Sequence, residues 1–148
     1  MRFSTRVEYG VIALVDIAKY SDSKNVVTAV EISKRQGISK KYLEQILPLL
    51  RQDKMIKAQK GLNGGYHLAK DTSKITMYDV VNALDPKVFE EMEIEDGEDN
   101  GELKRAVNKL FWDKINRSMI EFAKGKTLSD FVKECEDETM AKWDMYVI

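Results

Sequence analysis

The feature that most constrains the fold of this chain is a pair of short helices separated by only three residues, Gly37-Ile38-Ser39. The stretch Thr28-Ala29-Val30-Glu31 is a capping box, in which a threonine hydroxyl and a glutamate carboxylate satisfy free N–H groups at a helix start. Gly37 can end that helix by adopting a positive φ angle, and Ser39 can cap the next helix. Two helices joined by so short a turn predict a helix-turn-helix.

The second helix of this pair carries one apolar stripe. Its members recur at helical spacing and are Leu43, Ile46, Leu47 and Leu50. Pro48 lies inside the same helix, and proline both removes a hydrogen bond and clashes with the preceding turn. We therefore expect a kink or an early stop at Pro48, beyond the residues that would face a ligand.

A glycine-rich hairpin follows the helical pair. Residues 55–59 and 66–69 are short segments consistent with strands, and Lys60-Gly61-Leu62-Asn63-Gly64-Gly65 separates them. Glycine and asparagine can supply the positive φ angles of a hairpin tip, and the lysine gives that tip a charge. A helix-turn-helix followed by a basic hairpin predicts a winged helix; the alternative is a surface hairpin without a partner.

Further helices frame this unit. Thr5-Arg6-Val7-Glu8 predicts a capping box and a first helix to about Tyr20, and Thr76 begins a fourth helix that ends near Leu84. Residues 1–85 are thus expected to form a winged-helix domain. An acidic, mobile linker should occupy residues 86–101, and most of it belongs to an acid-rich stretch that extends from Glu90 to Glu102.

Residues 102–148 are expected to hold two more helices. A long helix is predicted from Glu102 to Lys124 with Gly125 as its stop, and a last helix from Thr127 to about Cys135. The long helix has more apolar surface than a lone helix can hide, so it packs on the domain or on a second copy. We expect it to mediate a homodimer through Leu103, Val107, Leu110, Phe111, Ile115, Met119 and Phe122.

The charge pattern favours a polyanionic partner. The net charge is −1, yet residues 1–80 sum to +6 and residues 81–148 to −7. The chain lacks a Gly-x-Ser-x-Gly motif, a phosphate loop, a metal-ligand cluster and a signal peptide, and it has one histidine and one cysteine. We therefore expect a cytoplasmic protein that is not an enzyme.

Several motifs, in this order and spacing, carry a family resemblance. They are Met1-Arg2-Phe3-Ser4-Thr5, Gly37-Ile38-Ser39, Tyr42-Leu43-Glu44-Gln45 and Gly64-Gly65-Tyr66-His67-Leu68. They resemble the Rrf-type winged-helix regulators, which include the iron–sulfur regulator IscR, the nitric-oxide sensor NsrR and the cysteine-metabolism repressor CymR. The resemblance implies a mainly α fold with a small β-wing, a long dimerisation helix, and sequence-specific DNA binding as a repressor.

The resemblance also implies roles for individual residues. Glu44 matches the family's base-reading glutamate in the major groove, where a carboxylate can accept a hydrogen bond from cytosine. The wing would reach a neighbouring minor groove, although Lys60 stands where arginine is commoner and Gly61-Leu62-Asn63-Gly64 replaces Gly-Pro-Gly-Gly. Tyr42 could instead be a packing aromatic. The full set expected to bind DNA is Arg2, Ser4, Thr5, Thr28, Ser39, Lys40, Lys41, Tyr42, Glu44, Gln45, Lys60, Gly61, Asn63 and Gly64.

No cofactor is expected. The family's cluster-binding members carry three cysteines between the fourth helix and the long helix, whereas residues 89–105 contain none. Cys135 is predicted to be a packing residue, and His67 to be structural. The chain is accordingly most similar to the cluster-free cysteine-metabolism branch.

The C-terminus, Trp143-Asp144-Met145-Tyr146-Val147-Ile148, suggests a protein partner. It resembles the tail of serine acetyltransferases, whose terminal isoleucine enters the active site of cysteine synthase (O-acetylserine sulfhydrylase), the corepressor partner of the cysteine-metabolism repressor. Tyr146, Val147 and Ile148 are thus candidate partner-binding residues. The alternatives are a tail that closes the core, a regulator with another signal (redox or a small ligand), and an adaptor that no longer reads DNA.

Overall fold

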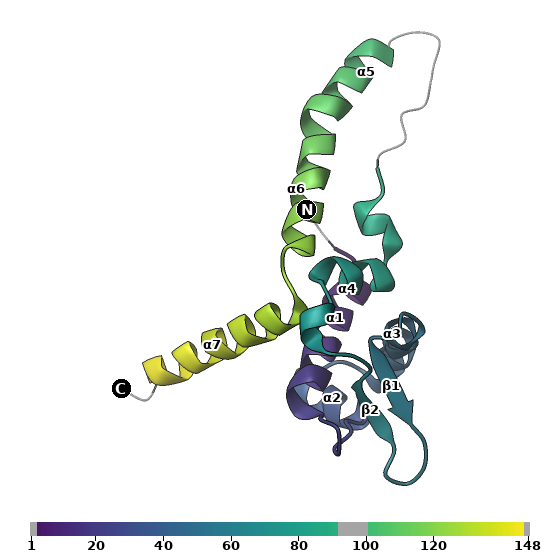
Figure 1. Ribbon diagram of the computed structural model, residues 1–148, viewed down its shortest axis with the longest axis vertical. Helices are drawn as coiled ribbons and strands as arrows, with labels where there is room; N and C mark the ends of the chain where they lie inside the picture. The colour runs from purple at the N-terminus through teal and green to yellow at the C-terminus, as the bar shows by residue number, and fades with distance from the viewer. Residues whose placement is uncertain (1–2, 92–100, 147–148) are drawn as a thin grey trace.

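The computed structural model describes residues 3–91 and 101–146, in which two helical arms project from a small domain (Figure 1). The domain contains α1 (Thr5–Tyr20), α2 (Ala29–Gln36), α3 (Lys40–Gln52), β1 (Ile56–Gln59), β2 (Gly65–Leu68), η1 (Thr72–Lys74), α4 (Met77–Leu84) and η2 (Pro86–Phe89). The arms are α5 (Gly101–Val107), η3 (Asn108–Trp112) and α6 (Asp113–Lys124), which form one long helix, and α7 (Leu128–Tyr146). No described helix is both long and apolar enough to cross a bilayer.

The core lies between α1, α2, α3 and α4. The predicted stripe of the second helix is confirmed, because Leu43, Ile46, Leu47 and Leu50 are each 0% exposed. They pack with further buried residues of the other elements and of the segments that connect them, chiefly Leu14, Ile17, Val27, Ile32, Ile38, Ile56, Ile75, Val80, Leu84 and Leu128. The apolar face of α3 is therefore fully buried inside the domain, and the opposite face of the helix is available to solvent or a ligand.

Capping follows the sequence in α2, α3 and α4. The capping boxes at Thr28 and Thr76 are present, Gly37 has a φ of 67°, and the Ser39 hydroxyl accepts from the Tyr42 N–H. The expected cap at Thr5 is wrong: Thr5 is the first helical residue, and Ser4 caps α1 by accepting from the Val7 N–H at 3.4 Å.

Pro48 does not end α3. The helix continues to Gln52, so the expected early stop is wrong. Pro48 lies on the exposed face, and the carbonyl group of Glu44, which loses its helical donor, belongs to the same face. Water can satisfy that carbonyl group, which removes part of the cost of proline inside a helix.

The wing is a two-stranded antiparallel hairpin with the register Ile56↔Leu68 to Gln59↔Gly65. Val27, just before α2, pairs with Tyr66 through two backbone hydrogen bonds of 2.8 and 2.7 Å and joins the wing to the helical pair. At the tip only Gly61 has a positive φ, of 107°. The expectation that Asn63 also supplies one is wrong, because a single left-handed residue closes this turn.

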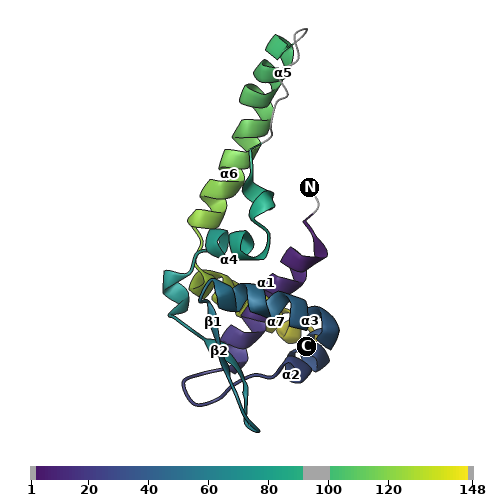
Figure 2. The same cartoon turned by 90° about the vertical axis from the view of Figure 1, so that its right-hand side faces the viewer.

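The arms depart from the sequence-based prediction in two respects. The long helix is confirmed (Figure 2). A π-helical turn at Asn108–Trp112 interrupts it. The last helix does not end near Cys135 but extends to Tyr146, since residues 136–146 contain neither glycine nor proline. Two backbone hydrogen bonds, Met77 N–H to Lys126 and Leu128 N–H to Ile75, fix the start of α7 beside α4.

The predicted acidic linker is described only at its ends. Residues 86–89 form the 3₁₀ turn η2, where the Phe89 ring stacks on Tyr78 at 4.9 Å between centroids. Residues 92–100 lie outside the described part of the chain.

Candidate nucleic-acid interface

The N-terminal half of α3 presents polar side chains away from the core. Lys40, Lys41, Glu44 and Gln45 are all exposed, on the side of the helix opposite its buried stripe. The first turn contains no acidic residue, so the helix dipole and both lysines favour an anion there. The hydroxyl of Ser39 accepts one backbone N–H at 3.1 Å and can still donate its own hydrogen. This surface can bind phosphate groups.

Glu44 makes no ion pair within the described residues, even though Lys40 precedes it by four positions on the helix. Its carboxylate is therefore an exposed acceptor whose hydrogen-bonding capacity is not used within the domain. A base amino group is a suitable donor for such a carboxylate.

Tyr42 differs from its neighbours because it is half-buried. Its ring meets that of Tyr9 edge-to-face, with centroids 5.5 Å apart, so it packs α3 against α1. A packing role for Tyr42 thus has direct structural support, and a contact between Tyr42 and DNA remains a prediction.

The residues near the starts of α1 and α2 that are expected to bind DNA are only partly available for that contact. Ser4 and Thr5 are exposed, and Arg6 next to them pairs with Asp85 of the α4 end at 3.5 Å. Thr28 is half-buried, and its hydroxyl oxygen already accepts the Glu31 N–H at 3.1 Å. Arg2 lies outside the described residues.

The wing tip combines charge with an exposed apolar residue. Lys60, Gly61 and Asn63 are exposed and Gly64 is half-buried, as the hairpin requires. Leu62 between them is 107% exposed, and sequence reasoning assigned it no role. Such exposure could not be read from the sequence, since it depends on which turn position the leucine occupies.

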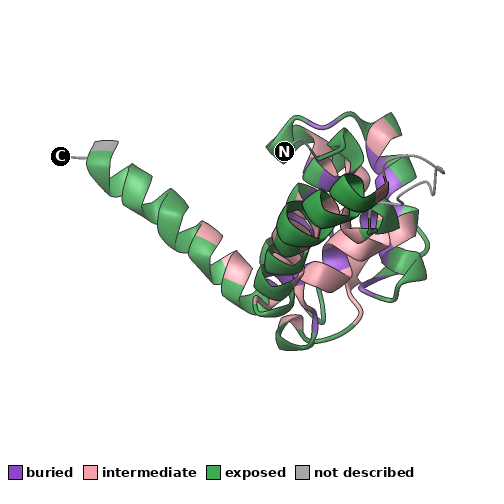
Figure 3. Cartoon of the chain, turned by 90° about the horizontal axis from the view of Figure 1, so that it is seen from above, coloured by how far each residue is buried: buried purple, intermediate pink, exposed green. Residues whose placement is uncertain are grey.

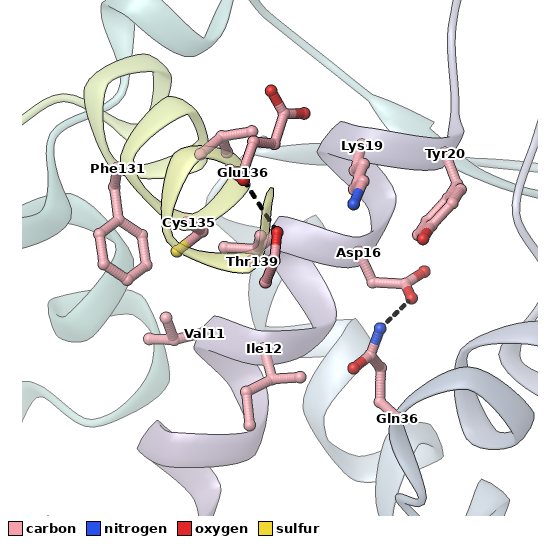
Figure 4. A pocket seen from close by; sticks show the side chains of 12 residues that line it. Val11, Ile12, Asp16, Lys19, Tyr20, Gln36, Phe131, Cys135, Glu136 and Thr139 are labelled. Atoms are coloured by element: carbon pink, nitrogen blue, oxygen red, sulfur yellow. Dashed lines mark hydrogen bonds between the residues drawn. The ribbon is translucent and has the colours of Figure 1, made fainter. Parts of the chain in front are cut away.

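A buried ion pair joins α1 to the end of α2. Asp16 of α1 is 2% exposed and accepts two hydrogen bonds from Arg35, at 3.0 and 2.8 Å. It also accepts one from Gln36 at 2.8 Å, which Figure 4 shows. The Arg35 guanidinium also lies 4.1 Å from the Tyr20 ring centroid. Its hydrogen bonds to the Asp16 carboxylate raise the pKa of Arg35 above its ordinary value, so the guanidinium stays charged. The signal missed in the sequence was an aspartate within the apolar repeat of the first helix.

The predicted dimerisation residues divide into two groups. Leu103, Val107, Leu110, Phe111 and Phe122 are exposed. Ile115 and Met119 are half-buried and line a small cavity against Val88, so they also pack on their own domain. Trp112, 44% exposed in the π-helical turn, belongs with the exposed group, although sequence reasoning omitted it.

Cys135 lines a cavity of about 240 Å³ between α1 and α7, together with Val11, Ile12 and Phe131 (Figure 4). Desolvation, followed by the neighbouring charges of Glu134 and Glu136, raises the pKa of its thiol. The thiolate that reacts with oxidants is therefore disfavoured. Of the candidate partner-binding residues, Tyr146 ends α7, while Val147 and Ile148 lie outside the described residues.

The chain is similar to known transcriptional regulators over most of its length. A family model described as "Rrf2: Iron-dependent Transcriptional regulator" matches residues 3–134. The HTH-type transcriptional regulator IscR of Sodalis glossinidius is 33% identical over 137 residues, which cover 92% of this chain and 81% of that protein.

Two solved structures share the fold. T. potens IscR has a TM-score of 0.75 and 31% identity, covering 99% of this chain and 96% of the other. CymR (YrzC), the global cysteine regulator of B. subtilis, has a TM-score of 0.73 and 26% identity, covering 90% and 98%. The predicted family resemblance and fold class are thus confirmed.

The iron in the family's description does not fit the residues of this chain. Iron–sulfur clusters are held by several thiolates, and the sequence contains one cysteine. Within residues 3–91 and 101–146 no three His, Cys, Asp or Glu side chains gather where they could hold a metal ion.

Proposed function

Because the chain belongs to the Rrf2 family of transcriptional regulators, we propose that it is a homodimeric repressor that inserts α3 into the major groove of its operator. In this proposal the wing reaches the adjacent minor groove, and the exposed apolar residues of α5, η3 and α6 form the dimer interface. The observation that carries the proposal is the start of α3, where two lysines and an unpaired Glu44 lie exposed beside free helix N–H groups.

Glu44 and the lysines have separate roles in this proposal. A carboxylate that meets a base edge carries sequence information, whereas lysines that meet phosphate position the protein without reading sequence. Hydrogen bonds to the DNA backbone would come also from Ser39, Gln45, Ser4 and Thr5. A two-fold dimer would place two such surfaces over a pseudo-palindrome.

Replacing Glu44 by Ala should relax base choice at one position per half-site. The expected loss of discrimination is about 1–3 kcal/mol, because one hydrogen-bonded base contact disappears. Sequence selection from a random duplex pool, followed by titration of the selected duplex and its point variants, measures this. An unchanged preference after Glu44→Ala would show that α3 is not the reading helix.

Lys41→Ala is the matched control on the same face. It should weaken binding to all sequences alike and reduce the slope of log K against log salt by about 1, because one fewer counterion is released. Binding of random duplex at low and high salt also separates this function from that of an adaptor that no longer reads DNA.

For regulation we propose control of cysteine metabolism, with cysteine synthase as corepressor partner. The support is the C-terminal sequence Tyr146-Val147-Ile148 and the description of a structural relative as a global cysteine regulator. The described end of α7 lies far from α3 and the wing, and Met140, Trp143 and Met145 are exposed along it (Figures 1 and 3). A partner held there would leave the DNA-binding surface accessible. The raised pKa of Cys135 gives less support to a thiol-based redox signal.

Deleting Ile148 should abolish binding to cysteine synthase, because the apolar side chain that anchors the proposed contact is lost. Titration of the enzyme with full-length and truncated protein measures this, with sedimentation to confirm that dimerisation is unchanged. Lys142→Ala, an exposed change in the same helix, should bind as the wild type does. Equal binding by the truncated chain would exclude the tail as the contact.

The coupling between DNA and enzyme must be reciprocal. If the enzyme raises affinity for DNA, DNA raises affinity for the enzyme by the same factor. O-acetylserine would compete for the enzyme's active site, displace the tail and weaken DNA binding. The sulfur supply would thereby control the binding of this regulator to its operator, without a cofactor on this chain.

A further inference from the structure

The turn of the wing holds Leu62 at its apex. The Gly64 N–H donates to the Gly61 carbonyl at 3.0 Å, so Leu62 and Asn63 occupy the two central positions of a β-turn. Gly61 has a φ of 107°, and a Cβ at Gly64 would collide with the Gln59 carbonyl oxygen. The two glycines therefore fix a turn that exposes Leu62 more than any other large hydrophobic residue in the described chain.

The charge around the turn identifies the kind of partner. Residues 54–70 contain four lysines and neither aspartate nor glutamate. Lys57 on β1 and Lys60 at the start of the turn are both exposed. An apolar tip on a hairpin with only positive charges matches a surface that is apolar at its centre and anionic at its rims.

The minor groove of DNA has that character. Its walls are deoxyribose rings, its rims are phosphates, and leucine is among the side chains that proteins insert there. Its floor distinguishes base pairs mainly through the guanine 2-amino group, a donor that projects from G·C pairs and is missing from A·T pairs. A leucine cannot accept a hydrogen bond from that donor, so burying the amino group against it is unfavourable.

We propose that Leu62 enters the minor groove beside each half-site and makes the wing select base pairs that lack the guanine 2-amino group. This inference rests on the proposed DNA-binding function and adds a specificity-determining residue to it. Lys60 contacts the phosphates of the rim, and Leu62 contacts sugars and base edges. The wing thus reads the floor of the groove with an apolar side chain instead of a charged one.

Inosine provides the decisive test. An I·C pair presents the major-groove edge of G·C but has no 2-amino group in the minor groove. With the duplex selected from a random pool, full-length protein is titrated against versions that carry A·T, I·C or G·C under the wing. The wild type should bind the A·T and I·C versions equally and the G·C version roughly tenfold more weakly, the size of one typical mismatch.

Three variants separate an apolar contact from charge. Leu62→Ala should bind the A·T duplex roughly tenfold more weakly, lose the discrimination against G·C, and keep the salt slope of the wild type. Leu62→Met, which keeps the apolar bulk, should behave as the wild type does. Lys60→Ala should reduce the salt slope by about 1 and keep the discrimination. Because Leu62 is fully exposed, its variants should unfold at the wild-type temperature.

The possible outcomes distinguish this inference from the function on which it rests. Discrimination that persists in Leu62→Ala, or an I·C duplex that behaves like G·C, overturns the role of Leu62. Glu44→Ala then still tests major-groove reading by α3 independently. A wild-type protein that retards no duplex from the pool overturns both.

Discussion

The double variant Leu110→Asp, Phe111→Asp is expected to sediment as a monomer and to bind its operator at least about 100-fold more weakly than the wild type. Both side chains are more than half exposed, at 62% and 55%, at the centre of the long helical arm. Two aspartates buried there in a dimer would be desolvated without a partner. Each monomer would then hold one half-site without help from the other.

Met140→Asp is the matched control for this variant. Met140 is 64% exposed on a helix as well, but it belongs to α7 and not to the long helix. It should remain a dimer with unchanged operator binding. Sedimentation at micromolar concentration and a retardation titration give both readouts, and a double variant that still sediments as a dimer would exclude the arm as the interface.

Asp16→Ala should lower the free energy of unfolding by about 3 kcal/mol, near the lower end of the range for breaking a buried ion pair. The change leaves Arg35 and Gln36, at the end of α2, without their shared acceptor on α1. The lower end applies because the Arg35 side chain is 30% exposed, so water can partly replace the lost carboxylate.

Glu134→Ala tests whether burial, and not the ion pair as such, is responsible. Lys126 bonds Glu134 at 2.7 Å, as short as the pair at Asp16, but the Glu134 side chain is 55% exposed. Solvent screens such a pair, so its loss should cost about 0–1 kcal/mol. Urea unfolding followed by circular dichroism measures both variants, and equal losses would contradict a special role of Asp16.

Local chemistry made much of the helix-turn-helix predictable. The capping box at Thr28, the glycine at position 37 and the cap at Ser39 act over a few residues each, so their sequence is sufficient evidence. The stripe of α3 was predictable for a related reason, because a helix of fixed period has a single apolar face. The same reasoning placed Glu44 and the lysines on the exposed face of α3.

The sequence was less informative where several local solutions were possible. Ser4 and Thr5 can both cap a helix, and the position of the first helical residue decides between them. Pro48 was tolerated because its face of α3 is exposed, which depends on how the helix packs. The last helix continued past Cys135 because no residue in residues 136–146 stops it.

By itself, then, the sequence determined the winged-helix plan, the exposed polar face of α3 and the lack of thiolates for a cluster, since each follows from residue type and short-range spacing. Only the tertiary structure decided that Asp16 pairs with Arg35, nineteen residues away along the chain. It also decided that Ile115 and Met119 turn partly toward their own domain and that Leu62 stands alone at the wing tip. These features depend on which distant segments of the chain pack together. That packing, and not a local sequence pattern, decides whether a side chain is buried or exposed.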